Sequence, residues 1–311
     1  MTRSAYIGAA FAIAFLLALT GCASVDKNAD APEAGRIAGL RAEGVEAAVA
    51  GDAARSRAAF ASALKSDRAI DNRGGEVVDL INLGRVSLAL GDVEGAKGYS
   101  GEAVSLASAL GDVKDLSEAY ATLAKAEYAS GGIDGAGSAI RHIDMALSLD
   151  KRDRAGDGAK MNVKGGALIA AGRAVEAEAV LNEALKSNLE GRDAMETGNS
   201  YRALAGTRVL GGRDGDALAD YRKAYEYDRA IGAGAKIAAD LRAIAALQMK
   251  AGQTAEAGFS LKRLYAVADA GNLTDEALFA LDNLIKLREG GADAEDFYRK
   301  RRDELLKGMR K

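Results

Sequence analysis

Seven glycines recur through most of this chain at an almost constant interval, and this period constrains the fold more than any other feature. The glycines lie 40, 40, 41, 40, 40 and 39 residues apart, and they are Gly51, Gly91, Gly131, Gly172, Gly212, Gly252 and Gly291. A fixed period of this length is typical of a stacked repeat array, in which each unit buries its apolar face against its neighbours. The period favours recognition over an extended surface rather than catalysis.

The composition indicates that the repeating unit is helical. Hydrophobic residues make up 49% of the chain, but aromatic residues only 5%, so alanine supplies much of the apolar surface that close helix packing needs. The only proline, Pro32, precedes the first repeat, which leaves the helices of the array uninterrupted. The net charge of −3 gives no sign of a nucleic-acid partner. The single cysteine, Cys22, excludes an intramolecular disulfide and a cysteine-rich metal site.

Each unit contains two amphipathic segments, which we term helix A and helix B. Helix A carries a small residue seven positions before the turn glycine, namely Gly44, Gly84, Ala124, Gly165, Ala205 and Ala245. A large apolar or aromatic residue lies four positions before each of these, and an apolar residue, large in all units but the first, lies four positions after. After the turn, where Asp52 and Asp92 are placed to cap the next helix, helix B carries a second small site: Ser56, Ala96, Ala136, Ala177, Ala217 and Ala257. A bulky residue usually follows four positions later.

This pattern resembles the tetratricopeptide repeat, and residues 80–96 form its clearest single unit. The family unit has about 34 residues, whereas this one has about 40 and lacks the usual final proline, as in longer-helix variants of the family. The resemblance covers residues 36–308. It implies an all-α solenoid of about seven antiparallel helix-turn-helix repeats, in which the polar last helix, beginning near Asp293, serves as a cap.

The first 21 residues have the features of a secretory signal peptide. Arg3 is followed by an apolar run over residues 5–19, which is too short for a stable transmembrane helix, and then by small residues. Leu19-Thr20-Gly21-Cys22 resembles the bacterial lipobox. That resemblance implies a lipoprotein in which Cys22 becomes the mature N-terminus, with a diacylglycerol on its thiol and an acyl chain such as palmitate on its amine.

Residues 22–35 are then the acylated N-terminus and a polar tether. Two or more acyl chains give durable anchoring. Ala23 stands where an aspartate would favour retention in the inner membrane, so the resemblance implies the outer membrane, facing the periplasm.

Catalytic motifs are missing from the sequence. His142 is the only histidine, which excludes multi-histidine metal sites, and its position within a helix B predicts a packing or surface role. Residues 132–137 superficially suggest a phosphate loop, but they fall on a repeat turn with no preceding strand. We therefore predict no enzymatic activity, no cofactor and no metal.

One cationic or amide side chain recurs on the same face of helix A in the first six repeats. In tetratricopeptide proteins this face lines the concave groove, so the resemblance implies a partner-binding groove for an acidic peptide: Arg41, Arg85, Lys125, Asn162, Arg202 and Arg242, joined by Asn82 and Asn199. The alternative is a solvated face whose long cationic side chains cover apolar surface.

Two further clusters have competing interpretations. The basic residues 299–311 suit a solvated capping helix or contact with anionic lipid. Tyr221, Tyr225 and Tyr227 share one helix B, and core filling by Tyr221 is favoured over a binding patch.

Three functions remain open at this stage. The first is a lipid-anchored, non-enzymatic adaptor of the bacterial envelope that binds a protein or peptide. The second is a periplasmic regulatory module that senses a small peptide or cell-wall fragment. The third is an enzyme with an unrecognised active site, which the missing motifs disfavour.

Overall fold

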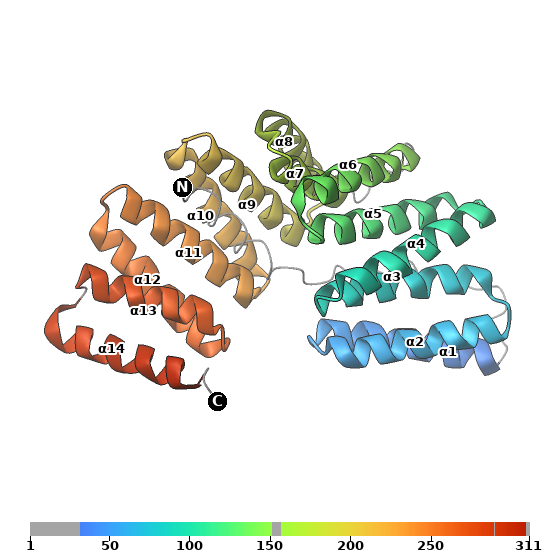
Figure 1. The fold of residues 1–311 in the computed structure, drawn as a ribbon, viewed down its shortest axis with the longest axis horizontal. Helices are drawn as coiled ribbons and strands as arrows, with labels where there is room; N and C mark the ends of the chain where they lie inside the picture. Colours follow the sequence, from blue (N-terminus) through green and yellow to red (C-terminus); the bar gives the residue numbers. More distant parts are fainter. Residues whose placement is uncertain (1–31, 151–156, 289, 309–311) are drawn as a thin grey trace. The chain divides into compact units, whose positions relative to one another are not determined.

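The computed structural model describes residues 32–150, 157–288 and 290–308, and these residues form helices and turns only. Figure 1 shows the fourteen helices of this part of the chain: α1 Pro32–Val49, α2 Ala53–Ala69, α3 Arg73–Ala89, α4 Val93–Leu110, α5 Val113–Ala129, α6 Gly132–Leu149, α7 Asp157–Ala170, α8 Ala174–Glu190, α9 Ala194–Leu210, α10 Asp214–Ala230, α11 Gly234–Lys250, α12 Thr254–Ala270, α13 Thr274–Leu287 and α14 Gly291–Gly308. The predicted signal peptide, Cys22 and most of the tether lie outside the described residues.

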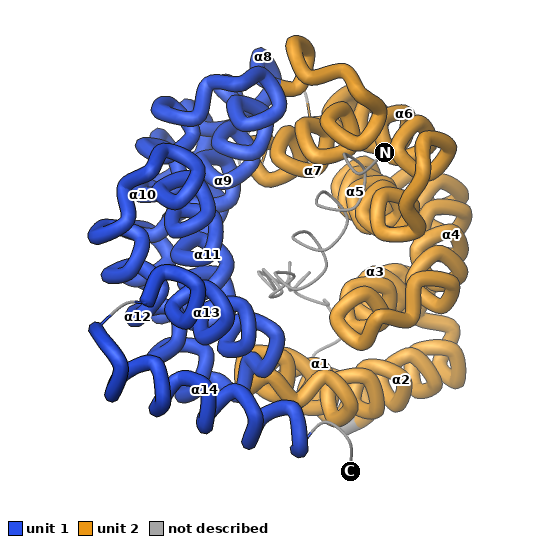
Figure 2. Tube along the Cα trace, turned by 60° about the vertical axis from the view of Figure 1, so that its left-hand side comes forward, with its two compact units in different colours: residues 1–14, 178–311 blue, residues 15–177 orange. Residues whose placement is uncertain are grey.

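The predicted all-α array of paired helices is confirmed. Predicted helices A and B are the odd-numbered and even-numbered helices, and consecutive helices pack against each other from α1 to α7 and from α9 to α14, in two compact units. The N-terminal unit ends at Ala177 and the C-terminal unit begins at Glu178, within α8. In each unit taken by itself, the odd-numbered helices lie on one face and the even-numbered helices on the opposite face (Figure 2). We call these the odd-helix face and the even-helix face.

Left-handed backbone makes the turn between the two helices of every repeat. All seven turn glycines have positive φ, from 71° at Gly252 to 82° at Gly291, a conformation that costs glycine little. The predicted caps are present, because Asp52 accepts from the amide of Arg55 and Asp92 from the amide of Gly95, at 3.0 and 2.9 Å. The turn glycines therefore mark, once in every repeat, the point at which helix A ends and helix B begins.

The turns between successive repeats follow the same period with less distinctive residues. Positive φ recurs there at Asp71, Gly111, Arg192, Gly232 and Asn272. Only two of these five are glycine, so the second set of turns is much harder to recognise in the sequence.

The core consists of small residues at helix crossings with bulky residues beside them. Gly44 illustrates the crossing within a repeat, because a Cβ built there would lie 2.8 Å from the Phe60 ring, and Phe60 is fully buried. The other predicted small sites of both helices are buried as well. Larger side chains such as Leu80 and Leu83 in the N-terminal unit, and Leu261 and Leu281 in the C-terminal unit, fill the spaces between helices.

Helix α14 ends the described array and has the polar character predicted for a cap. Tyr298 is its one buried residue, and Leu305 packs partly against the core of the C-terminal unit. The remaining surface of α14 is largely exposed and charged, as expected for a capping helix. None of the described helices has the length and apolar character that a bilayer crossing requires.

Candidate functional site

Arg41 of α1 joins three helices of the N-terminal unit. Its Nε donates to Asp79 of α3 at 2.8 Å, and its Nη2 donates to the carboxylates of both Asp79 and Asp67, the latter on α2. Both aspartate side chains are fully buried, whereas the arginine is about one quarter exposed. One guanidinium therefore links the two helices of repeat 1 to the first helix of repeat 2.

Arg202 of α9 makes the same arrangement in the C-terminal unit. It donates through Nε to Asp240 of α11 at 2.8 Å, and through Nη2 to Asp240 at 3.0 Å and to Asp228 of α10. These aspartates are also fully buried. We call the two sets, Arg41 with Asp67 and Asp79 and Arg202 with Asp228 and Asp240, the arginine triads.

Each arginine triad contains two carboxylates for one arginine, and burial makes the second negative charge costly. Burial raises the pKa of Asp79 from its ordinary value of 3.8 to about 7, although Arg41 opposes the shift. Burial likewise raises the pKa of Asp240 to about 7 against the pull of Arg202. The raised pKa values of Asp79 and Asp240 therefore mean that each triad gains or loses one proton near neutral pH.

A second kind of contact links neighbouring helices of the odd-helix face. In the N-terminal unit, Arg85 of α3 donates to Glu118 of α5 at 2.5 Å. Lys160 of α7 pairs with the same Glu118 at 3.0 Å and with Asp150 at 2.6 Å. Burial disfavours ionised Glu118, but Arg85 and Lys160 outweigh it and hold the pKa of Glu118 below its ordinary value.

The C-terminal unit contains a matching contact between α11 and α13. Arg242 pairs with Glu276 at 2.9 Å, and its guanidinium carbon lies 4.3 Å from the centroid of the Phe279 ring. Arg242 is 39% exposed and Glu276 18%. The Arg85 and Glu118 side chains are 15% and 34% exposed. Unlike the arginine triads, each of these two arginine–glutamate pairs keeps a partly exposed carboxylate.

All of the predicted groove residues lie on odd-numbered helices, but they do not form one uniform set. The structure distinguishes two kinds of arginine among them: Arg41 and Arg202 hold buried aspartates between helices, whereas Arg85 and Arg242 pair with partly exposed glutamates. Their binding of a partner stays a prediction.

The amide and lysine members of the predicted groove are at least half-buried. Asn82 is buried in α3, and Lys125 and Asn162 are half-buried and engaged in interactions of their own. Asn199 accepts from Arg202 at 3.1 Å and from Lys236 at 3.0 Å, so it extends the arginine triad of the C-terminal unit.

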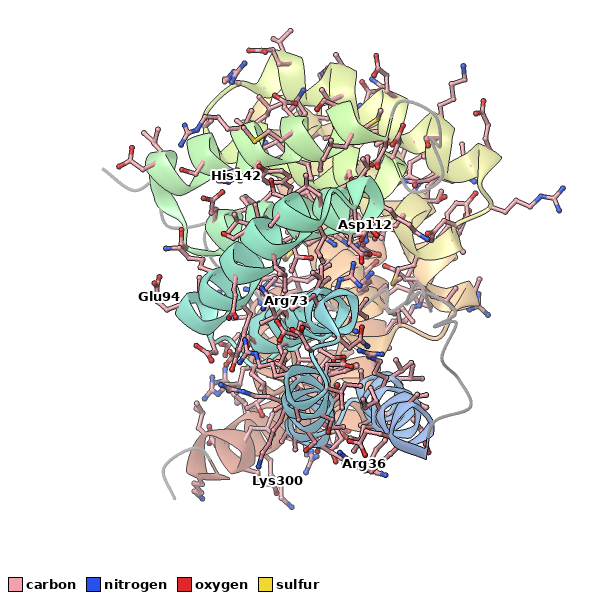
Figure 3. All side chains as sticks on the ribbon, turned by 90° about the vertical axis from the view of Figure 1, so that its right-hand side faces the viewer. Arg36, Arg73, Glu94, Asp112, His142 and Lys300 are labelled. Carbon is pink, nitrogen blue, oxygen red and sulfur yellow. The ribbon has the colours of Figure 1, made fainter. Side chains whose placement is uncertain are left out.

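His142, labelled in Figure 3, has the packing role predicted for it. Its ring stacks on Tyr120 of α5 with centroids 5.7 Å apart, and its Nδ1 lies 2.6 Å from Glu127 Oε2. Tyr221 packs partly buried in the C-terminal unit, as expected, and burial raises its pKa to about 12. No group of three or more metal-binding side chains gathers among the described residues.

Sequence reasoning missed the acidic partners of these cations. The signal was present, because Arg41, Asp67 and Asp79 have the same mutual spacing as Arg202, Asp228 and Asp240: 26 and then 12 residues in both triads. An arginine and two aspartates that recur together four repeats later indicate a shared contact, which single positions read one repeat at a time do not reveal.

Comparisons with known proteins identify the fold. No family model matches the chain, and no curated protein matches its sequence. Among solved structures, the chain is similar to a signal-transduction ATPase with a tetratricopeptide repeat sensor from Pyrococcus horikoshii, with a TM-score of 0.65 and 15% identity over 86% of this chain. The chain spans only 41% of that protein.

Two further structures match over most of both chains. A Rap protein complexed with Competence and Sporulation Factor has a TM-score of 0.58 and 15% identity, over 88% of this chain and 77% of its own. NprR in complex with its cognate peptide NprX has a TM-score of 0.58 and 13% identity, over 88% and 78%. Identities this low establish the fold alone, and that fold is of the tetratricopeptide type.

Proposed function

We propose that this protein is a non-enzymatic scaffold of the bacterial cell envelope that binds a peptide or protein partner through the odd-helix face of each unit. One observation carries the proposal. An arginine of one odd-numbered helix pairs with a partly exposed glutamate of the next, as Arg85–Glu118 in the N-terminal unit and as Arg242–Glu276 in the C-terminal unit. The same device therefore places a guanidinium on this face in both units.

These arginines suit the recognition of acidic groups. A guanidinium presents several N–H donors in a fixed plane, so it can hold its own glutamate and accept a second carboxylate from a ligand. Hydrogen bonds to charged groups contribute about 1.5–3 kcal/mol each, more than neutral ones. The arginine triads are unsuited to this role, because two fully buried aspartates already occupy each guanidinium.

The similar structures support a peptide or protein as the partner. The Rap protein and NprR, whose folds this chain shares, were each solved with a bound factor or peptide. Solenoids of stacked helix pairs generally use their extended surfaces for binding. For this chain, we propose an acidic segment as the ligand.

A variant pair tests the odd-helix face. Arg85→Gln combined with Arg242→Gln removes one cation from each unit, and we expect recovery of co-purifying envelope proteins from cross-linked cells to fall by about tenfold or more. The control combines Arg57→Gln with Arg299→Gln, which are partly exposed arginines of even-numbered helices with carboxylate partners. Equal recovery from both variants, with both folded by circular dichroism, would discard the proposal.

The membrane anchor is proposed from the sequence alone. Cys22 follows a signal-like segment and a lipobox-like stretch, so a lipid on its thiol would hold the protein at the outer membrane, facing the periplasm. We expect Cys22→Ser to move the protein from the membrane fraction to the soluble fraction. Mass spectrometry of the wild-type N-terminus should find acyl chains on Cys22, and an unmodified cysteine would refute the anchor.

A further inference from the structure

The even-helix face of the C-terminal unit contains a cavity of about 520 Å³ between α10 and α12. Residues of α11 form part of its lining, including Ile244 and Gln248. Tyr225 comes from α10, and Phe259 and Arg263 come from α12. The cavity therefore combines apolar, aromatic and cationic side chains on the face opposite to the proposed groove.

Phe259 breaks the repeat pattern at this cavity. Two positions before the bulky site of helix B, every earlier repeat has a small residue: Ala58, Gly98, Ser138, Ala179 and Ala219. Phe259 occupies the corresponding position of α12, where its side chain is 63% exposed. A large apolar side chain at an exposed position adds little to the core, so packing does not account for it.

Arg263 gives the cavity its charge. Its guanidinium carbon lies 4.7 Å from the centroid of the Tyr225 ring and 5.5 Å from that of Phe259, and Nη2 donates to the Tyr225 hydroxyl. Arg222 also lines the cavity, and no carboxylate among the described residues pairs with either arginine. Glu256 is the one acidic side chain in the lining.

In the next repeat, the same arginine–tyrosine contact is accompanied by two carboxylates, and we call this the complete form of the contact. Arg301 of α14 donates to the hydroxyl of Tyr265 at 3.0 Å, as Arg263 does to Tyr225, but it also pairs with Asp269 and Glu304 at 3.0 and 2.7 Å.

The cavity lacks the acidic residues of that complete form. The positions that correspond to Asp269 and Glu304 are occupied by Arg229 and Ala266. Arg263 therefore retains the tyrosine contact without either carboxylate, and a carboxylate from outside would restore the arrangement.

We infer that this cavity is a second docking site, which takes a partner segment with an apolar side chain next to a carboxylate. The apolar group lies against Phe259 and the α11 lining, and the carboxylate accepts hydrogen bonds from Arg263 and Arg222. This site is independent of the proposed odd-helix groove, because it lies on the opposite face and uses none of the same residues.

Ligand-observed ¹⁹F NMR on the full chain tests the inference, because the fluorine signal of a small probe broadens when the probe binds. The probe is N-acetyl-4-fluorophenylalanine, and its C-terminal amide is the uncharged control compound. We expect the acid to bind about tenfold more tightly than the amide, as a charge-assisted hydrogen bond implies. Phe259→Ala and Arg263→Gln should each remove most of the line broadening. Phe297→Ala, which changes another exposed phenylalanine, should leave it unchanged.

Three results would overturn the inference. They are no broadening of the acid by the wild type, equal affinity for acid and amide, and full binding by Phe259→Ala. Loss of self-association by Phe259→Ala in light scattering, without any effect on the probe, would assign the surface to a second copy of this chain instead.

Discussion

The two arginine triads occupy equivalent places in the two units, but their surroundings differ. In the N-terminal unit, the amide of Asn72, the N-cap of α3, donates to Asp67 at 2.8 Å. In the C-terminal unit, the corresponding N-cap is Ala233, which offers no side-chain donor, and the Oδ1 atom of Asp228 has no hydrogen-bond partner.

The C-terminal unit has a second cation near its triad, which donates to Asn199 rather than to Asp228. Lys236 is buried three residues after the cap, where the N-terminal unit has Gly75. Burial lowers the pKa of Lys236, while Asp228 and Asp240 oppose that shift. The comparison teaches that the second aspartate of a triad can be accommodated in two ways, by a hydrogen bond from a neutral amide at Asp67 or by the charge of a buried lysine near Asp228.

The largest expected effect is the loss of a central arginine. Arg41→Met leaves two buried aspartates without their cation, which should lower the free energy of unfolding by about 3–5 kcal/mol. Arg202→Met should cost less, because Lys236 still offsets the charge of Asp228. Urea unfolding followed by circular dichroism at 222 nm measures both. Equal losses would show that Lys236 does not compensate, and losses below about 1 kcal/mol would contradict a structural role for either triad.

The next largest effect is expected from filling the narrow space beside the triad of the N-terminal unit. A Cβ at Gly75 would lie 2.5 Å from Asn72 Nδ2 and Asp67 Oδ2 and 2.6 Å from Arg41 Nη2, so Gly75→Ala should cost about 1–3 kcal/mol. Gly74→Ala is the matched control, since its nearest atom is 4.0 Å away, and it should stabilise the helix by up to about 1 kcal/mol. Thermal unfolding separates the two, and a stable Gly75→Ala would mean that the triad yields readily.

The raised pKa values predict a pH dependence with a definite sign. Folded Asp79 keeps its proton up to about pH 7, whereas the unfolded chain releases it near 3.8. Its stabilising contribution is therefore complete below that lower value and is lost as the pH rises through 7. Asp79→Asn should gain stability relative to wild type between pH 5 and 7 and no more above 8. Melting temperatures at pH 5, 6, 7 and 8 measure this difference, and a constant offset would refute it.

The smallest expected effect transfers the amide from one unit to the other. Ala233→Asn gives α11 an N-cap and places a donor near Asp228, as Asn72 does near Asp67. We expect a gain of about 0.5–1 kcal/mol in the free energy of unfolding. The reciprocal change, Asn72→Ala, should cost a similar amount or more. If both variants destabilise the protein, the two junctions are not interchangeable.

The repeat period was sufficient to predict the helices of the array. The left-handed glycines, the caps at Asp52 and Asp92 and the buried small residues all follow from local rules that act within one repeat. Resemblance to the tetratricopeptide repeat then gave the pairing of successive helices. Turns such as the one at Arg192 escaped notice because left-handed residues other than glycine leave no clear signal.

The sequence predicted where the residues of the candidate site lie on the helices, but it did not predict which contacts they make. Sequence spacing placed Arg41 and Arg85 on one helix face, but it could not distinguish a cation that holds two buried carboxylates from one beside a partly exposed glutamate. That distinction depends on Asp67 and Asp79, which come from two other helices. Contacts between repeats decide it, and a reading confined to helix A does not include them.

Site-specific photo-crosslinking in living cells tests the central claim of a binding odd-helix face most directly. A photoreactive phenylalanine at Ala246, exposed one turn after Arg242 on α11, should capture a discrete partner, whereas the same group at Ala58, exposed on α2 of the even-helix face, should not. Adding Arg242→Gln should weaken the capture at Ala246. Capture at Ala58 but not at Ala246 would contradict the claim.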